Sequence, residues 1–102
     1  MTVHNLKCWS SAFRETVEGR KPYEIRMNDR DYHLGDILRL WEWKPEPGEA
    51  TGWVCEVTVT SMAQGRWGLP SDICVLGFDP RAATATLTTA PIPSYISARR
   101  RP

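Results

Sequence analysis

Hydrophobic and polar residues alternate most clearly along residues 53–60. The apolar positions are Trp53, Cys55, Val57 and Val59. A period of two places successive side chains on opposite faces of a β-strand. The pattern therefore predicts a strand that buries its apolar face and points Glu56 and Thr58 outward.

A shorter alternation covers residues 23–27. Its two faces consist of Tyr23, Ile25 and Met27 on one side and Glu24 and Arg26 on the other. Before this segment, Trp9, Phe13 and Val17 recur every four residues, which is typical of one face of a helix. Ser10 or Ser11 can cap such a helix, which is expected to run to about Glu18.

The remaining elements are less regular. Further strands are predicted at residues 5–9, 37–43, 73–78 and 84–89, and a loop at residues 63–70. One early helix followed by strands predicts a mixed α+β fold of about five to six strands. We expect its sheet to curl into a partly closed barrel, because closure removes exposed strand edges.

The chain ends in a segment rich in proline and arginine. Residues 91–102 combine three prolines with small residues and three arginines. Such a composition buries little apolar surface, so we expect this segment to be a disordered tail. Residues 1–90 are then the single folded domain.

Composition narrows the class of protein. The 102 residues are enough for one domain, and no apolar run is long enough to span a membrane. The first residues show no secretory signal pattern, so we expect a cytoplasmic protein. The net charge of +1 combines +1 over residues 1–39, −4 over residues 40–80 and +4 over residues 81–102. The three cysteines cannot all pair within one chain, so we expect free, buried thiols, and we expect neither a metal site nor a cofactor.

Charged and amide side chains are densest in one short segment. They are Lys21, Glu24, Arg26, Asn28, Asp29 and Arg30. Lysine and arginine bind phosphate, and a glutamate accepts hydrogen bonds from the exocyclic amine of a base. The segment is therefore a candidate nucleic-acid or ligand-binding site. The alternative is that Glu24 and Arg26 form ordinary ion pairs on a solvated sheet face.

Three residues outside this segment are further candidates. Trp67, in a loop flanked by glycines, can stack on a base or cover the core. His4 can transfer protons near neutral pH or serve as a structural hydrogen-bonding group. Lys7 completes the set of candidate binding residues.

The segment Gly19–Arg26 reads GRKPYEIR and resembles the G-x-K-x-x-E-x-R motif of ASCH domains, in the PUA-like superfamily. The surroundings are similar to one branch of small proteins, frequent in phages and bacteria and usually left as a domain of unknown function. The shared motifs are H-x-L-K-x-W at residues 4–9, E-I-R-x-N-D-R-D-[FY] at 24–32, G-D-x-L-x-L at 35–40, T-G at 51–52 and G-L-P at 68–70.

The resemblance implies a small PUA-like pseudo-barrel with the N-terminal helix packed at its side. It also implies a cleft, lined by residues 21–30, that binds RNA or a modified nucleotide. Some ASCH relatives are amidohydrolases that act on acylated cytidine through a lysine, a threonine and a glutamate. Lys21 lies at the lysine position, Glu24 lies at the threonine position, and Asp72 is the only acid in the region of the later glutamate.

Three functions follow, and the sequence alone leaves them open. We favour binding of RNA or a modified nucleotide. The second is a metal-independent hydrolase of a modified nucleoside or single-stranded RNA, with Lys21 as base or charge stabiliser and Glu24 as proton shuttle. The third is a phage accessory protein that binds a host protein.

Overall fold

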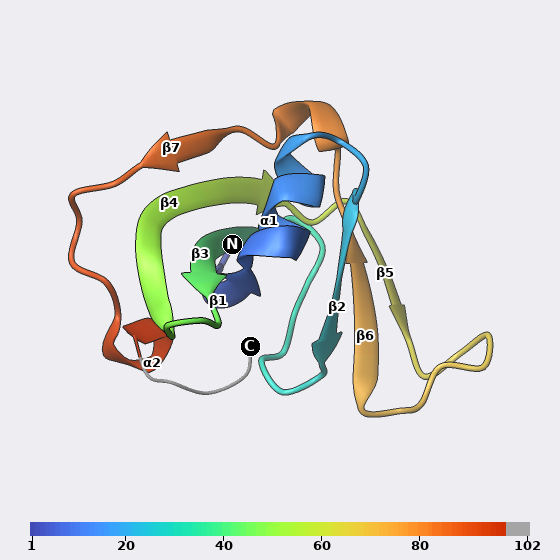
Figure 1. Ribbon diagram of the computed structural model, residues 1–102. Coiled ribbons are helices and arrows are strands. Elements are labelled where there is room, and N and C mark those ends of the chain that lie inside the picture. Colours follow the sequence, from blue (N-terminus) through green and yellow to red (C-terminus); the bar gives the residue numbers. More distant parts are fainter. Residues whose placement is uncertain (98–102) are drawn as a thin grey trace.

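The apolar runs of the sequence fold into two β-sheets (Figure 1). The computed structural model describes residues 1–97. The first sheet consists, in spatial order, of β1 (Val3–Trp9), β3 (Ile37–Lys44), β4 (Glu49–Thr58) and β7 (Ala85–Leu87). The second consists of β2 (Tyr23–Met27), β6 (Ile73–Gly77) and β5 (Ser61–Gln64). β1 and β3 are parallel, and the other neighbouring strands are antiparallel.

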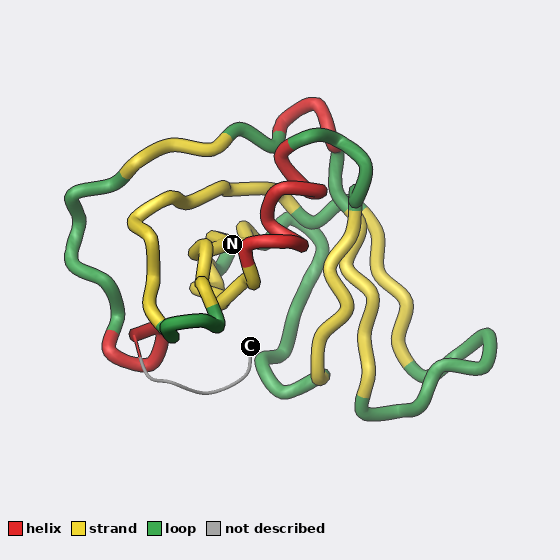
Figure 2. The backbone as a smooth tube through the Cα atoms, in the orientation of Figure 1, coloured by secondary structure: helices red, strands yellow, loops and turns green. Residues whose placement is uncertain are grey.

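The core lies between the two sheets. Leu6 of β1, Leu40 of β3, Leu76 of β6 and Phe13 of α1 (Ser10–Val17) belong to one buried cluster. Figure 2 shows β4 bending around β3 and β1, with the second sheet standing to one side. The α+β class is therefore confirmed. The strands of residues 1–97 form no closed barrel, because no ladder joins the two sheets.

The strand count exceeds the predicted five to six, because residues 1–97 contain seven strands. The additional strand is β5, whose last two residues fall in the segment 63–70 that the sequence predicts as a loop. β5 pairs with β6, which is the central strand of its sheet. A strand of four residues that is mostly half-buried leaves too weak a periodic pattern to be recognised.

The helix α1 is found where the sequence predicts it, but it is not capped by serine. The residue at its N-cap is Trp9, and no side chain among the described residues caps the first turn. The Ser10 hydroxyl instead donates to the carbonyl of Trp43 on β3 at 3.3 Å. Gly19 follows the helix with φ of 80°, a left-handed conformation that glycine adopts without strain.

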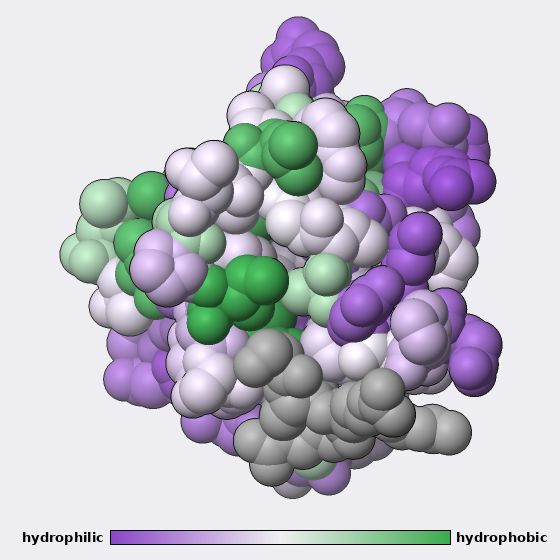
Figure 3. Space-filling view, turned by 60° about the vertical axis from the view of Figure 1, so that its left-hand side comes forward, coloured by the Kyte–Doolittle hydropathy of each residue, from purple (hydrophilic) through white to green (hydrophobic). Residues whose placement is uncertain are grey.

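β4 corrects one prediction of burial. Cys55, Val57 and Val59 are buried as expected, but Trp53 is 43% exposed, and its neighbour Val54 is buried. Trp53 pairs with Leu87, which is also exposed. Figure 3 shows the side of the molecule on which β4, β7 and the short helix α2 (Ser94–Ser97) lie, with hydrophobic residues near the middle and at the left edge and hydrophilic ones mainly at the top and right.

Part of the segment expected to be an unpacked tail forms the short helix α2, which packs against the first sheet. Ile96 is buried and packs with Trp41 and Val54, which belong to the first sheet. This contact explains why Val54 is buried, because α2 covers the side of β4 to which Val54 belongs. A three-residue 3₁₀ helix, Pro80–Ala82, starts the connection from β6 to β7. Residues 98–102 of the predicted tail lie outside the described residues. None of the helices within residues 1–97 is both long and apolar enough to cross a membrane.

Candidate functional site

A cleft of about 810 Å³ opens where β1, β2, α1 and α2 meet. Its walls combine basic, aromatic and aliphatic side chains. The lining residues are Leu6, Lys7, Cys8, Trp9, Ala12, Lys21, Glu24, Ile25, Arg26, Met27, Asp29, Arg30, Tyr32, Ile73, Tyr95 and Ile96. Six of the nine predicted site residues therefore lie around one cavity.

Glu24 is the buried acid of this cleft, with 4% of its surface exposed. Its two carboxylate oxygens accept hydrogen bonds from different cations. Lys21 Nζ donates to Oε1 at 2.8 Å, and Arg26 Nε donates to Oε2 at 3.0 Å. Glu24 and Arg26 do form an ion pair, as the alternative expects, but not on a solvated face, because their side chains are only 5% and 13% exposed.

Two arginines connect the second sheet and its following turn to the open edge of β1. Arg26 donates to the Lys7 carbonyl at 2.6 Å, and Arg30 donates to the Asn5 carbonyl at 2.8 Å. Within residues 1–97, β1 pairs only with β3, so these carbonyls belong to a sheet edge that would otherwise need another partner. The arginines thus hold the two walls of the cleft together while their side chains line it.

Lys7 is buried in the wall of the cleft. Its ammonium lies 3.9 Å from the ring centroid of Trp43, within cation–π distance. Cys8, which follows it, also lines the cleft, and burial raises the pKa of its thiol to about 12. The thiol is therefore protonated at neutral pH and is a poor nucleophile.

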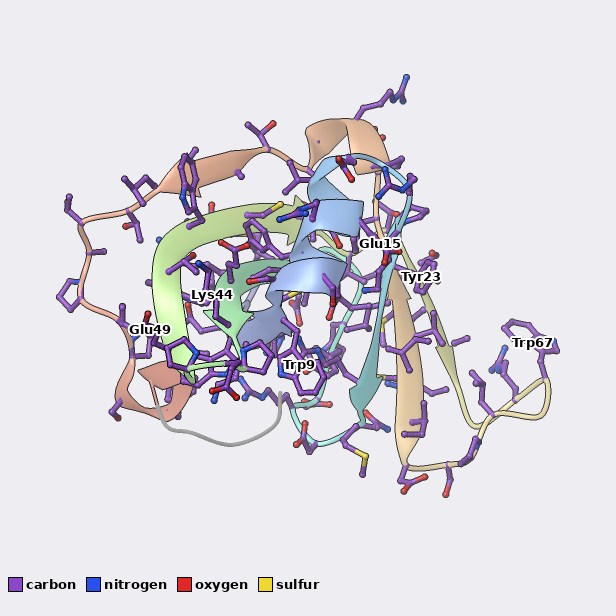
Figure 4. The ribbon with its side chains drawn as sticks, in the orientation of Figure 1. Trp9, Glu15, Tyr23, Lys44, Glu49 and Trp67 are labelled. Atoms are coloured by element: carbon purple, nitrogen blue, oxygen red, sulfur yellow. The ribbon has the colours of Figure 1, made fainter. Side chains whose placement is uncertain are left out.

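Three predicted site residues lie outside the cleft lining. Asn28 accepts a hydrogen bond from Gln64 at 3.2 Å. Trp67 lies in the loop between β5 and β6, which Figure 4 shows projecting away from Trp9 and the cleft. Trp67 is 79% exposed, so it does not cover the core.

His4, the third of these residues, holds a structural hydrogen bond. Its Nε2 lies 2.8 Å from Asp36 Oδ2, and both side chains are buried. Because a carboxylate only accepts, the ring nitrogen is the donor. Asp36 also accepts from the backbone amides of Thr2 and His33. These bonds, led by that of His4, lower the pKa of Asp36 to about 2.

The aromatic residues of the cleft were not predicted as site residues. Trp9, Tyr32 and Tyr95 come from the end of β1, the turn after β2 and α2. The stripe of Trp9 with Phe13 signals only a helix face, and Tyr95 falls in the segment expected to be a tail. Asp72, the acid nearest to the expected catalytic glutamate, is exposed and does not line the cleft. Among residues 1–97, no three His, Cys, Asp or Glu side chains are grouped to hold a metal ion.

Comparison with known proteins adds a family. Residues 3–78 match the family described as a domain of unknown function (DUF3850). The chain belongs to this family. A relative from Escherichia phage P2, an uncharacterized 12.9 kDa protein in the GpA 3′ region, is 37% identical over 60 residues. That alignment covers 59% of this chain and 53% of the relative, so the chain matches about half of the relative's length.

The DUF3850 match includes most of the cleft. β1, α1, β2 and β6 all fall within residues 3–78, and with them the cluster of Lys21, Glu24 and Arg26. The helix α2 falls outside the match.

Proposed function

We propose that this cleft binds RNA or a modified nucleotide, as a cytoplasmic ASCH/PUA-like domain would. One observation carries the proposal: basic and aromatic side chains line the same cavity. Among the described residues, its four cations, Lys7, Lys21, Arg26 and Arg30, outnumber its two acids, Glu24 and Asp29. A site with excess positive charge and accessible rings suits a ligand that has both phosphate and a planar base. The phage P2 relative supports a phage-associated setting.

Each member of the cluster has donors or acceptors left for a ligand. A carboxylate has about four acceptor positions, so Glu24 can bind a base amine beside Lys21 and Arg26. A guanidinium carries five N–H donors, so Arg26 can keep its two bonds and still contact a phosphate oxygen. The ion pairs hold these groups in position before the ligand arrives.

Arg30 gives the sharpest test, because it is an exposed cation of the cleft. Glu24 is a poorer probe, because its loss would leave two cations uncompensated in a buried setting. Arg30→Ala should weaken binding of a fluorescein-labelled, random-sequence hexaribonucleotide pool, measured by fluorescence anisotropy. Between about 50 and about 200 mM salt, the logarithm of the binding constant falls linearly with the logarithm of the salt concentration. The magnitude of this slope should decrease by about 0.7, the value for one lost phosphate contact to a single strand.

Arg81→Ala is the matched control. Arg81 is also an exposed arginine, but it pairs with Asp79 and lies outside the cleft lining. This variant should bind as the unmodified protein does. Equal losses for both variants would indicate general charge attraction and contradict a site in the cleft. The proposal would also be contradicted if the unmodified protein bound neither the pool nor free nucleotides.

A second candidate is a metal-independent hydrolase of a modified nucleoside. The buried contact of Lys21 with Glu24 inside a cavity favours it. Water would attack the carbonyl carbon of an acylated base, the C–N bond would break, and the amine would leave with a proton. Glu24 would carry that proton from the water to the nitrogen, and Lys21 would stabilise the oxyanion.

An assay with acylated cytidine separates the two functions. The protein is incubated with this compound, and free cytidine and the released acid are detected by mass spectrometry. A hydrolase should lose turnover about 100- to 10,000-fold in Glu24→Gln while still binding its substrate. If the cleft only binds, neither the unmodified protein nor Glu24→Gln should release product, and the substitution should lower only the affinity for the ligand.

A further inference from the structure

The aromatic rings of the cleft differ in how much surface they offer a ligand. Tyr32 is 3% exposed and packs against His4, with the ring centroids 4.7 Å apart. Burial also raises the pKa of its hydroxyl to about 12, so Tyr32 is a neutral part of the wall. Trp9 and Tyr95 are 36% and 42% exposed, and both line the cavity. Trp9 and Tyr95 therefore have ring surface on which a base can stack, whereas the buried ring of Tyr32 does not.

Tyr95 is held at the cleft by its neighbours. The next residue, Ile96, is 1% exposed and fixes α2 to Trp41 and Val54 of the first sheet. On the other side, Arg30 Cζ lies 5.7 Å from the centroid of the Tyr95 ring. Arg30 is itself held by its bond to the Asn5 carbonyl. An exposed ring anchored from both sides loses little conformational freedom when a ligand binds, which favours affinity.

We propose that Tyr95 is the base-stacking residue of the cleft, and that Arg30 beside it binds the phosphate of the same nucleotide. This inference rests on the proposed function and deepens it. An aromatic ring next to a guanidinium offers the two chemistries that one nucleotide unit requires. Tyr95 takes the role that the sequence suggests for Trp67, which lies outside the cleft. Because α2 follows the family match at residues 3–78, the ligand is contacted by a segment outside the shared family region.

Tyr23 provides a matched control. It is 40% exposed, and its ring lies 5.2 Å from the ammonium of Lys21, but it does not line the cleft. With the random hexaribonucleotide pool, Tyr95→Ala should weaken binding about 5- to 100-fold, as loss of one base–aromatic stack does. Tyr95→Phe keeps the ring and should bind within about twofold of the unmodified protein, and Tyr23→Ala should do the same. The salt slope should stay unchanged in Tyr95→Ala, because stacking releases no counterions.

Tyr95→Leu separates stacking from packing. Leucine keeps apolar volume on α2 without a ring, so this variant should melt as the unmodified protein does and still bind as weakly as Tyr95→Ala. Recovery of binding in Tyr95→Leu would assign Tyr95 a packing role and overturn the inference. If Arg30→Ala weakens binding and Tyr95→Ala does not, the proposed function stands and the inference falls. If the unmodified protein binds neither the pool nor free nucleotides, both fall.

Discussion

Single residues of the cluster show what local spacing can and cannot predict. Lys21, Glu24 and Arg26 are close in sequence, and a strand alternation places Glu24 and Arg26 on one face, so their proximity could be predicted. The alternation does not say which face is buried. That depends on β1, which is distant in sequence and accepts a bond from Arg26 through the Lys7 carbonyl.

The aromatic residues of the cleft escaped prediction for the same reason. Trp9 lies in the expected helix stripe, and Tyr95 lies in a segment whose composition favours disorder. Each joins the site only because elements far apart in the sequence meet there. A basic cluster leaves a local signal in the sequence, but the rings that complete a cavity do not.

The lowered pKa of Asp36 predicts that the folded protein loses stability in acid. Its pKa is about 2 in the folded protein, mainly because His4 donates a hydrogen bond to it, and about 3.9 is usual for an unfolded chain. The unfolded state therefore binds a proton at higher pH than the folded state. The stabilisation is present above about pH 4 and is lost as the pH falls towards about 2.

Melting temperatures measured between about pH 5 and about pH 2 test this prediction. The unmodified protein should lose stability more steeply over this interval than Asp36→Asn, which cannot titrate at this position. Asp31→Asn is the control, because the Asp31 side chain is 92% exposed, and this variant should follow the unmodified protein. Parallel curves for all three proteins would show that Asp36 does not carry the effect.

At the scale of elements, the two strands with clear alternation bury different kinds of faces. β4 buries apolar Cys55 and Val57, as a half-buried strand usually does. β2 turns Glu24 into the cleft and leaves Tyr23, Ile25 and Met27 exposed. An exposed apolar face with a polar face turned inward is unusual for a strand that serves stability alone. The exposed apolar face of β2 is also the surface on which a host protein, the third function considered, would be expected to bind.

The short helix α2 predicts a stability effect that the sequence does not suggest. Ile96 is 1% exposed against Trp41 and Val54, so Ile96→Ala removes buried methyl groups and leaves a cavity. The free energy of unfolding should fall by about 2–4 kcal/mol, measured by urea denaturation. Ile92→Ala is the control, because Ile92 is 38% exposed and should contribute much less. Equal, small effects of both substitutions would support the expectation of an unpacked tail.

Taken as a whole, the molecule depends on contacts between its two sheets. No strand pairing joins the sheets within residues 1–97, so the shared apolar core and the arginine bonds to β1 hold them together. The sequence predicts most of the strands, because each leaves a local pattern. It does not predict how they divide into two sheets, because pairing between distant strands depends on how the whole chain closes.

The three cysteines report on this shared core. Cys8 lies on β1, Cys55 on β4 and Cys74 on β6, and all three are free thiols in one buried cluster. Burial raises the pKa of Cys8 to about 12 and that of Cys55 to about 11, and it also raises the pKa of Cys74. Only a thiolate reacts with a disulfide reagent such as Ellman's reagent, so the folded protein should react slowly.

Labelling should therefore follow opening of the core. At about pH 8, all three thiols should react together, at a rate that rises with urea as the free energy of unfolding falls. A Ser71→Cys variant is the control, because Ser71 is exposed and its replacement should react at once. Rapid reaction of a single native thiol, located by mass spectrometry of the labelled peptides, would show that one sheet opens independently of the other. Reaction of Cys8 alone would place that opening at the cleft, because Cys8 is the one cysteine of the described chain that lines it.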